Sequence, residues 1–259
     1  MVISFALILS ACGTSDSKND SEDTKKTIRV VTAAEYAPFE YMDKGDVVGF
    51  DIDLVNAVAQ EAGYKVMIEH VGWDPIFVEI EEKRADFSAS AITINDKRKQ
   101  SYDFASPYFL STNMIMVKEG SDIKTAADLK DKKIAVQNGT TGQEAVEKLL
   151  SANHPNIKKF ESIPLAIMEL KNGGVDAVVA DNTVVEEYVK NNPKDKLKVV
   201  EDEDAFDVEY FGFLFPKGSK LTAEIDVALK TVLENGTYAK LYKEWFGVEP
   251  NVQKLTAEQ

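Results

Sequence analysis

The stretch from Ser90 to Arg98, SAITINDKR, places hydroxyl side chains (Ser90 and Thr93) ahead of a single arginine at the end of a strand-like run. A guanidinium can meet a carboxylate with two parallel hydrogen bonds, which a lysine cannot match. The pattern therefore indicates an anion site with a polar wall. A surface arginine in a charged loop, beside Asp96 and Lys97, explains the residues equally well at this stage.

Polar residues also lie at two further points where a predicted strand is followed by a helix. Thr140 and Thr141 follow Gly139 where a strand gives way to a helix, and backbone N–H groups at a helix start favour anions. Plain helix capping is the alternative. Asp181 ends the apolar run VDAVVA, and a carboxylate exposed there suits an ammonium group. Because Asn182 follows, Asp181 could instead cap the next helix.

Composition excludes several classes of function. The chain has 259 residues, enough for one large domain or two ordinary ones, and its 44% apolar content suits a globular core. A net charge of −14 argues against nucleic-acid binding and favours solubility, with a mild attraction for cationic solutes. The single cysteine, Cys12, excludes an internal disulfide, and the two histidines, His70 and His154, give little material for a metal site or a catalytic triad. We expect no metal and no cofactor.

The N-terminus looks like a targeting segment. Residues 1–9, MVISFALIL, are apolar but shorter than the roughly 20 residues that span a bilayer. The following Leu9-Ser10-Ala11-Cys12 resembles the lipobox of bacterial lipoproteins, in which the cysteine receives a lipid and becomes the mature N-terminus. No basic residues precede the apolar run, which is compatible with a start further upstream. Residues 13–27 are polar and predict a flexible tether.

Strand-like and helix-like segments alternate along the rest of the chain, which predicts an α/β fold with a largely parallel sheet. The pattern restarts after about residue 126, so we expect two lobes. Ligands of such sheets bind beyond the carboxyl ends of the strands, which predicts one shared cleft. The expected strands are 28–32, 66–70, 86–91, 133–137, 157–160 and 175–180, and the expected helices lie within 48–63, 75–83, 126–129, 143–150, 165–172, 183–190 and 223–246.

Several motifs carry a family resemblance in a fixed order. They are YAPFEY at 36–41, VGFDIDL at 48–54, ITI at 92–94 with Lys97-Arg98, YDFASPY at 102–108, Val136 with GTT at 139–141, GVDAVV at 174–179, NGTY at 235–238 and WFG at 245–247. Together they resemble the polar amino-acid solute-binding proteins of ABC importers. Within that group the chain is most similar to the arginine-, lysine- and histidine-binding lipoproteins of Gram-positive bacteria.

The resemblance implies a type II periplasmic-binding fold. It places residues 28–110 and 207–248 in the first lobe, 113–204 in the second, and 249–259 in a C-terminal tail. The chain would cross between the lobes near 109–113 and 205–209, and the lobes would close around ligand by a hinge motion.

The resemblance also implies roles for site residues. Arg98 would bind the carboxylate of a free amino acid, and Thr140 and Thr141 would add hydroxyl and amide donors. Tyr36 and Trp73 would sandwich the ligand side chain, since aromatic faces suit aliphatic stems and cations. Without the resemblance, core packing would be the better explanation of the two aromatic residues.

The ligand ammonium would lie on the other side of the cleft. The resemblance assigns it to Asp181, the backbone carbonyl of Ala91 and the hydroxyl of Thr93. Ser90 and Gln137 would line the same cleft.

One position departs from the family pattern. Many relatives carry an aspartate three residues before the aromatic residue at Tyr36, where it contacts a polar or cationic ligand side chain, but this chain has Ala33. A buried cation without a partner is costly. Either another carboxylate, such as Glu35 or Asp74, replaces the aspartate, or the ligand is an uncharged amino acid such as glutamine or cystine.

These observations predict an extracytoplasmic, lipid-anchored, monomeric protein that captures a polar amino acid, expected to be basic. Its partners would be the free L-amino acid, an ABC permease with its ATPase, and the membrane through the lipid on Cys12, with no nucleic acid. Two alternatives stay open. One is a dehydratase-type enzyme on the same fold, which would need a general acid or base in the cleft. The other is a sensor lipoprotein that binds amino acids without transport.

Overall fold

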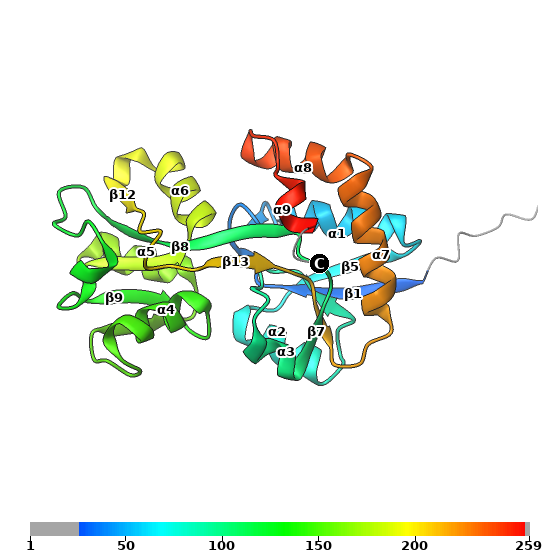
Figure 1. Cartoon of the computed structure of the whole chain (residues 1–259), viewed down its shortest axis with the longest axis horizontal. Helices are drawn as coiled ribbons and strands as arrows, with labels where there is room; N and C mark the ends of the chain where they lie inside the picture. The colour runs from blue at the N-terminus through cyan, green and yellow to red at the C-terminus, as the bar shows by residue number, and fades with distance from the viewer. Residues whose placement is uncertain (1–25, 257–259) are drawn as a thin grey trace, which may run out of the picture.

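The structure, a computed structural model, describes residues 26–256. Two α/β lobes lie side by side, and the long strand β8 (Phe109–Lys118) runs between them beside β13 (Val208–Phe211), as Figure 1 shows. The two strands are antiparallel, with Phe211 opposite Phe109 and Val208 opposite Thr112. Within residues 26–256 no helix combines the length and the apolar character needed to cross a bilayer.

Lobe 1 is built on the sheet β5-β1-β6-β14-β7. Strand β1 runs parallel to β5 and β6, whereas β14 is antiparallel to β6 and β7. Helices α1, α7 and α8 cover one face of the sheet, and α2 covers the other (Figure 1). The strands are β1 (Thr27–Thr32), β5 (Lys65–His70), β6 (Phe87–Ser88), β7 (Tyr102–Phe104) and β14 (Leu214–Pro216). The helices are α1 (Phe50–Glu61), α2 (Trp73–Glu81), α3 (Asp96–Ser101), α7 (Leu221–Glu234), α8 (Thr237–Phe246) and α9 (Val252–Thr256).

A small antiparallel sheet, β2-β3-β4, adds to lobe 1 between β1 and α1. Its strands are β2 (Glu35–Tyr36), β3 (Glu40–Asp43) and β4 (Asp46–Val48). Gly49 follows it with a φ of 141°, and a Cβ there would lie 2.0 Å from the carbonyl oxygen of Phe39. Only glycine allows this close approach, so Gly49 fixes how α1 leaves the small sheet.

Lobe 2 is built on the sheet β10-β9-β11-β8-β12. Strands β10, β9 and β11 are parallel, while β8 is antiparallel to β11 and β12. Helix α4 lies against one face, and α5 and α6 against the other (Figure 1). The strands are β9 (Ile134–Gln137), β10 (Ile157–Phe160), β11 (Ala177–Asp181) and β12 (Leu197–Val200). The helices are η1 (Ala126–Leu129), α4 (Thr141–Leu150), α5 (Ile163–Asn172), α6 (Asn182–Asn191) and η2 (Pro193–Asp195).

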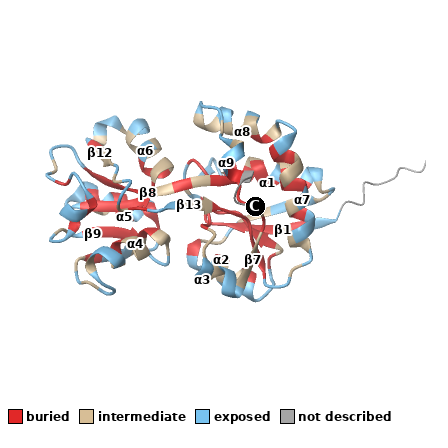
Figure 2. Cartoon of the chain, in the orientation of Figure 1, coloured by how far each residue is buried: buried red, intermediate tan, exposed pale blue. Residues whose placement is uncertain are grey.

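Buried residues follow the strands of both sheets and the inward faces of the helices, as Figure 2 shows. Aromatic rings concentrate where β8 and β13 meet lobe 1. Phe109 and Phe211 stack with centroids 5.7 Å apart, and Phe39 meets each of them edge-on. Such ring pairs add to the stabilisation that burial already provides, so the root of the connecting strands is firmly packed.

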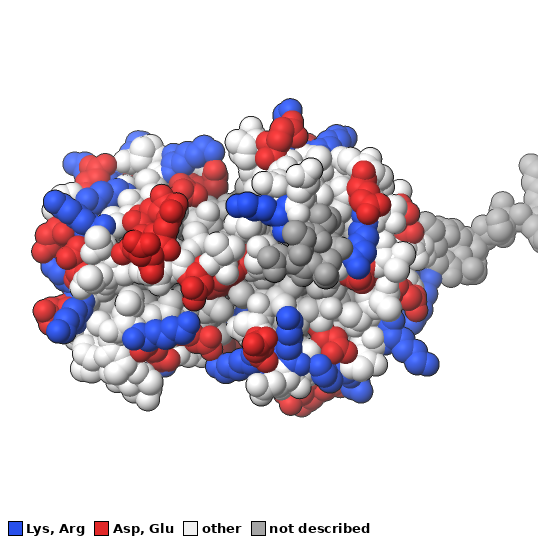
Figure 3. All heavy atoms as spheres, viewed as in Figure 1, with Lys and Arg blue, Asp and Glu red and all other residues white. Residues whose placement is uncertain are grey.

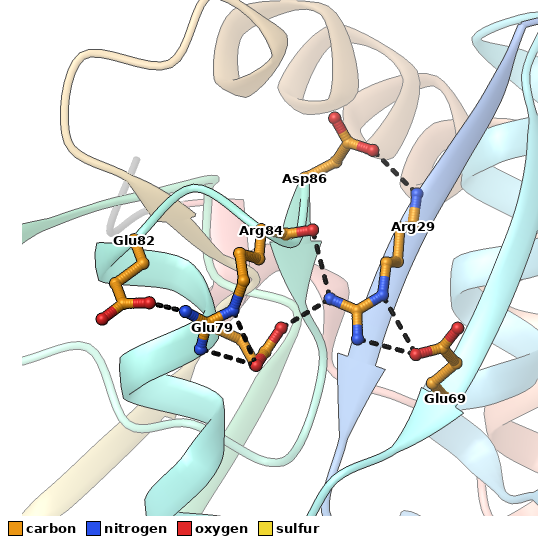
Figure 4. Close-up of polar contacts among 6 residues, drawn as sticks. All are labelled: Arg29, Glu69, Glu79, Glu82, Arg84 and Asp86. Atoms are coloured by element: carbon orange, nitrogen blue, oxygen red, sulfur yellow. Dashed lines mark hydrogen bonds and ion pairs between the residues drawn. The ribbon is translucent and has the colours of Figure 1, made fainter.

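Arg29, in the middle of β1, joins β1, β5 and α2 (Figure 4). Its guanidinium contacts Glu69 of β5 and Glu79 of α2, each at 2.7 Å. Arg84 reaches the same Glu79 at 2.8 Å, and the two arginines together lower the pKa of that carboxyl to about 2. The network orients α2, the helix that begins with Trp73.

Most expected elements form within a few residues of their predicted bounds, but two regions differ. The strand expected over 86–91 ends at Ser88. The chain turns at Ala91, where φ is +46°, and Thr93 then pairs with Phe211 of β13. In addition, residues expected to form a tail contain α9, whose Leu255 is buried.

The sheet β2-β3-β4 is not among the expected elements, because its strands are only two to four residues long. The exact lobe boundaries stay a prediction.

Candidate functional site

A polar pocket lies between the lobes, beside the connecting strands. All ten residues for which the sequence predicted ligand contact line it, and it is completed by Ala33, Glu35 and Glu40. The ten are Tyr36, Trp73, Ser90, Ala91, Thr93, Arg98, Gln137, Thr140, Thr141 and Asp181. The structure thus brings the expected set together, while its role in binding stays a prediction. Cys12 lies outside the described residues.

Arg98 is held by two kinds of contact. Its Nη1 donates to the carbonyl of Thr93 at 2.8 Å, and its Nη2 donates across the cleft to the carbonyl of Gly139 at 3.3 Å. The guanidinium carbon also lies 5.5 Å from the ring centroid of Trp73 and 5.6 Å from that of Phe77. Among residues 26–256 no carboxylate forms an ion pair with Arg98, so its positive charge is directed at the pocket without being neutralised.

Helix α4 presents its N-terminus to the same region. The Thr140 hydroxyl donates to the carbonyl of Gln137 at 2.8 Å and accepts from the N–H of Gln143 at 3.3 Å, so it caps the helix. The Thr141 hydroxyl donates to Glu209 at 2.7 Å. Both hydroxyl protons are therefore used within the protein. The first backbone N–H groups of α4, which have no partner in the helix, are the donors left for an anion.

Asp181 of lobe 2 receives hydrogen bonds from both sides of the joint. The Tyr36 hydroxyl of lobe 1 donates to one carboxylate oxygen, and the Ser111 hydroxyl of β8 donates to the other at 2.8 Å. Asp181 makes no capping bond to α6, so its side chain points into the cleft. Burial, followed by the nearby Glu209 carboxylate, raises the pKa of Asp181 to about 7. A cation placed here would relieve that unfavourable charge.

A buried acidic pair, which the sequence analysis did not identify, supports the lobe 1 wall. The Ser90 hydroxyl donates to Glu40 at 2.9 Å and accepts from the backbone N–H of Ala33 at 3.0 Å. Ser90 and Glu40 are at most 2% exposed. Ser90 therefore acts as a bridge that fixes β1 against β3 behind the pocket.

The second member of the pair is Asp51 of α1. It accepts from the backbone N–H of Ala91 at 2.9 Å and from the Tyr108 hydroxyl at 2.6 Å. The bond to Ala91 holds that residue in its left-handed conformation, which is costly for a residue other than glycine. Burial raises the pKa of Asp51 to about 7 and raises that of Glu40 well above its ordinary value. Each carboxyl also has one buried oxygen without a hydrogen-bond partner among the described residues, so a proton shared between them satisfies both.

The sequence did hold a signal for this pair. Glu40 lies between Phe39 and Tyr41, and Asp51 between Phe50 and Ile52. A lone acidic residue within an aromatic or aliphatic run indicates a buried and partnered charge.

The two carboxylates that could replace the missing aspartate at position 33, those of Glu35 and Asp74, lie in different places. Glu35 lines the pocket, but Asp74 does not. Asp74 instead faces the edge of lobe 2, where Asn138 contacts it at 3.5 Å. Trp73 adds a buried indole N–H that has no acceptor among the described residues. Across residues 26–256 no group of three or more His, Cys, Asp or Glu side chains could hold a metal ion.

Two α/β lobes joined by a pair of strands, with a charged pocket between them, define a cleft-type binding protein for a small molecule. Residues 28–248 match the bacterial extracellular solute-binding proteins, family 3, and the chain belongs to that family.

Named relatives agree with this assignment. A probable histidine-binding protein of Neisseria gonorrhoeae is 42% identical over 94% of this chain and 92% of its own length. The crystal structure of the arginine-, lysine-, histidine-binding protein ArtJ from Geobacillus stearothermophilus has a TM-score of 0.88 and 55% identity, over 89% of this chain and all of its own. An ancestral arginine-binding protein bound to glutamine has a TM-score of 0.81 and 41% identity, over 86% of this chain and 99% of its own.

Replacing the cleft arginine tests the anion site directly. We expect Arg98→Ala to weaken amino-acid binding about a hundredfold or more, because charge-assisted hydrogen bonds to the ligand carboxylate are lost. Isothermal titration calorimetry measures the loss, and circular dichroism checks the fold. Lys99→Ala removes an exposed positive charge one residue away and serves as the control. Unchanged affinity in Arg98→Ala would contradict the assignment.

Proposed function

We propose that this protein captures a free basic L-amino acid (arginine, lysine or histidine) outside the cell membrane and delivers it to an ABC permease with its ATPase. The observation that carries the proposal is the pairing of opposite charges across one small pocket. Arg98 and the N-terminus of α4 suit a carboxylate, and Asp181 with the Thr93 hydroxyl suits an ammonium group. An α-amino acid carries both groups on the same carbon atom, so one ligand can satisfy both sites.

The charge of the pocket favours a ligand with an additional positive charge. Two acidic residues, Glu35 and Asp181, line it against the single cation Arg98; Glu40 also lines it, but burial raises its pKa well above the ordinary value, so it is not counted as a charge. An amino-acid zwitterion adds no net charge, whereas arginine or lysine adds one positive charge and improves the balance. The relatives named for histidine and for arginine, lysine and histidine support the same class.

The outer surface of the protein is also negatively charged. The whole chain carries a net charge of −14. Acidic side chains gather on one face of lobe 2, over the stretch that leads from β12 to β13, as Figure 3 shows. Residues 201–204, with the sequence EDED, belong to this stretch. A negative surface raises the local concentration of a cationic solute, an effect that salt screens.

Glu35 is the carboxylate that we assign to the ligand side chain. It lies two residues from Ala33, lines the pocket, and is exposed. Glu40 is less suited, because Ser90 and the shared proton with Asp51 already engage its carboxyl.

An uncharged polar ligand is the second candidate. Ala33 removes the family aspartate that contacts the ligand side chain, and the ancestral arginine-binding protein mentioned above was solved with glutamine. Glutamine or cystine would then occupy the pocket with the same backbone contacts.

Three further features belong to the proposal. The protein performs no chemistry on its ligand, it acts as a monomer, and a lipid on Cys12 anchors it to the outer face of the membrane. Family membership supports the first, since the similar proteins are named for what they bind. The lipobox-like sequence supports the anchor.

Calorimetric titration with five amino acids tests the function. The full chain with Cys12→Ser is unfolded and refolded to remove carried ligand, and then titrated with arginine, lysine, histidine, glutamine and cystine. We expect submicromolar binding of at least one basic amino acid, weaker binding of glutamine and cystine, and ligand recovered chemically unchanged. Binding confined to an uncharged amino acid would establish the second candidate, and no binding to any of the five would reject amino-acid capture.

Glu35→Gln separates the two candidates further. If Glu35 meets the ligand cation, the substitution should lower affinity for arginine and lysine by about tenfold and leave glutamine binding within about twofold. Competition titrations measure both values on one preparation. Asp46→Asn, an exposed charge change on the same small sheet, is the matched control. Equal losses of affinity for charged and uncharged ligands would show that Glu35 does not contact the cationic group of the ligand side chain.

Asp181 predicts how binding depends on pH. The ligand ammonium requires an ionised carboxylate, but the pKa of Asp181 is raised to about 7 in the ligand-free protein. Lowering the pH protonates it, so affinity for arginine should fall by about tenfold between pH 8 and pH 6. Arginine is the ligand of choice, because its own charge is constant in this range. Asp181→Asn should bind weakly with a flat pH profile, and a wild-type profile that is equally flat would contradict the prediction.

A further inference from the structure

Glu209 of strand β13 collects three hydrogen bonds from three different parts of the molecule. Its Oε2 accepts from the hydroxyls of Thr93 and Thr141, each at 2.7 Å. Its Oε1 accepts from the Asn113 side-chain amide at 2.8 Å. The residue is half-buried, and among residues 26–256 no ion pair involves it. Three neutral donors therefore satisfy this carboxylate.

The two threonine donors come from opposite sides of the cleft. Thr93 lies on the segment of lobe 1 that follows β6, and Thr141 opens helix α4 of lobe 2. The two hydroxyl oxygens are 3.5 Å apart, and a single oxygen of Glu209 binds both. If the lobes separate, Thr93 and Thr141 move apart, and Glu209 can retain only one of them.

Glu209 itself is fixed in place by backbone pairing. It lies opposite Ser111 in the antiparallel ladder between β13 and β8. On the next residue, the carbonyl of Tyr210 accepts from the N–H of Ile94 at 2.8 Å, which ties β13 to the Thr93 segment. The contact to Thr93 is therefore local and persistent, whereas the contact to Thr141 bridges the joint.

The direction of the bonds decides what the two hydroxyls can offer a ligand. A hydroxyl has one proton, and a carboxylate can only accept. Because Thr93 and Thr141 both donate to Glu209, their oxygens have only lone pairs left for other partners. Lone pairs suit an ammonium group and repel a carboxylate. Glu209 thereby separates the ammonium end of the pocket from the carboxylate end at Arg98.

We propose that Glu209 is a positioning residue that latches the closed cleft and orients the Thr93 and Thr141 hydroxyls as acceptors for the ligand ammonium. The inference rests on the proposed amino-acid binding for its second half only, since the latch between the lobes requires no ligand. A neutral glutamine oxygen at this position accepts hydrogen bonds more weakly than a carboxylate oxygen, and the glutamine NH2 group would face the Asn113 amide donor, so glutamine cannot hold the three donors equally well.

The distance between the lobes tests the latch. In the full chain with Cys12→Ser, fluorescent labels on Asp46→Cys of lobe 1 and Lys130→Cys of lobe 2, both exposed, report the distance in single molecules without ligand. Glu209→Gln should enlarge the open fraction severalfold. Thr141→Val should do the same while leaving the connecting strand intact, which keeps the test valid if Glu209→Gln folds poorly. Glu203→Gln, an exposed charge change ahead of β13, is the control. Distributions identical to the parent in both latch variants would overturn the proposal.

A double-mutant cycle tests the orientation of the hydroxyls. Glu209→Gln and Thr141→Val should each weaken arginine binding about tenfold or more. If Glu209 acts through Thr141, the double variant should bind no more than about twofold worse than the poorer single variant. Losses that multiply would show independent effects and overturn the positioning role. If the parent binds no amino acid, the proposed function fails, and the distance measurement alone decides whether Glu209 latches the cleft.

Discussion

The ladder between β8 and β13 is the constraint on which the rest of the site depends. These two antiparallel strands join the lobes, and stacked Phe109 and Phe211 pack their root into the lobe 1 core. Polar side chains along the same strands hold residues that line the pocket: Ser111 donates to Asp181, and Glu209 accepts from Thr93 and Thr141. A bend in this ladder would displace Asp181, the proposed ammonium site, and would change the angle between the lobes at the same time. Under the proposal, opening and ligand binding are coupled by the same few residues, as expected for a hinge.

Two buried carboxyl groups at or behind the pocket lower the stability of the ligand-free protein. Desolvation raises the pKa values of Asp51 and Asp181 to about 7, far above the ordinary value of an aspartate. The native ligand-free state thus binds more protons than the unfolded chain between about pH 4 and pH 7, so these groups lower the free energy of unfolding as the pH rises through that range. A cationic ligand next to Asp181 reverses the effect there. Asp181 therefore lowers the stability of the ligand-free protein, but it provides the carboxylate that a cationic ligand needs.

The sequence predicted the architecture and the site membership more fully than the site's internal bonding. Elements with a clear apolar pattern formed where expected: α1 buries one apolar face, and β9 is a short apolar strand that is buried on both faces. The ten candidate residues gathered because they follow strand ends or helix starts that face one cleft. Glu209, in contrast, carries no local signal: it lies in a short strand within an acidic stretch, and only the register against β8 brings it to Thr93 and Thr141. The turn at Ala91 was likewise invisible, since a non-glycine residue takes a positive φ only when distant groups such as Asp51 hold it there.

Recognition of the amino-acid backbone and of its side chain are assigned to different parts of the molecule. Arg98, the start of α4 and Asp181 can fix any zwitterion, because every amino acid offers the same two groups. In the proposed arrangement the ligand side chain meets the segment around Ala33 and Glu35, with Tyr36 and Trp73, which line the pocket from lobe 1. Substitutions at Ala33 or Glu35 would change the preferred ligand while leaving the proposed latch at Glu209 in place, whereas Tyr36 also donates to Asp181 across the cleft. This separation explains how one fold serves relatives named for histidine, arginine and lysine. We therefore propose that Ala33, more than any of the residues assigned to the carboxylate and ammonium groups, decides this protein's own selectivity.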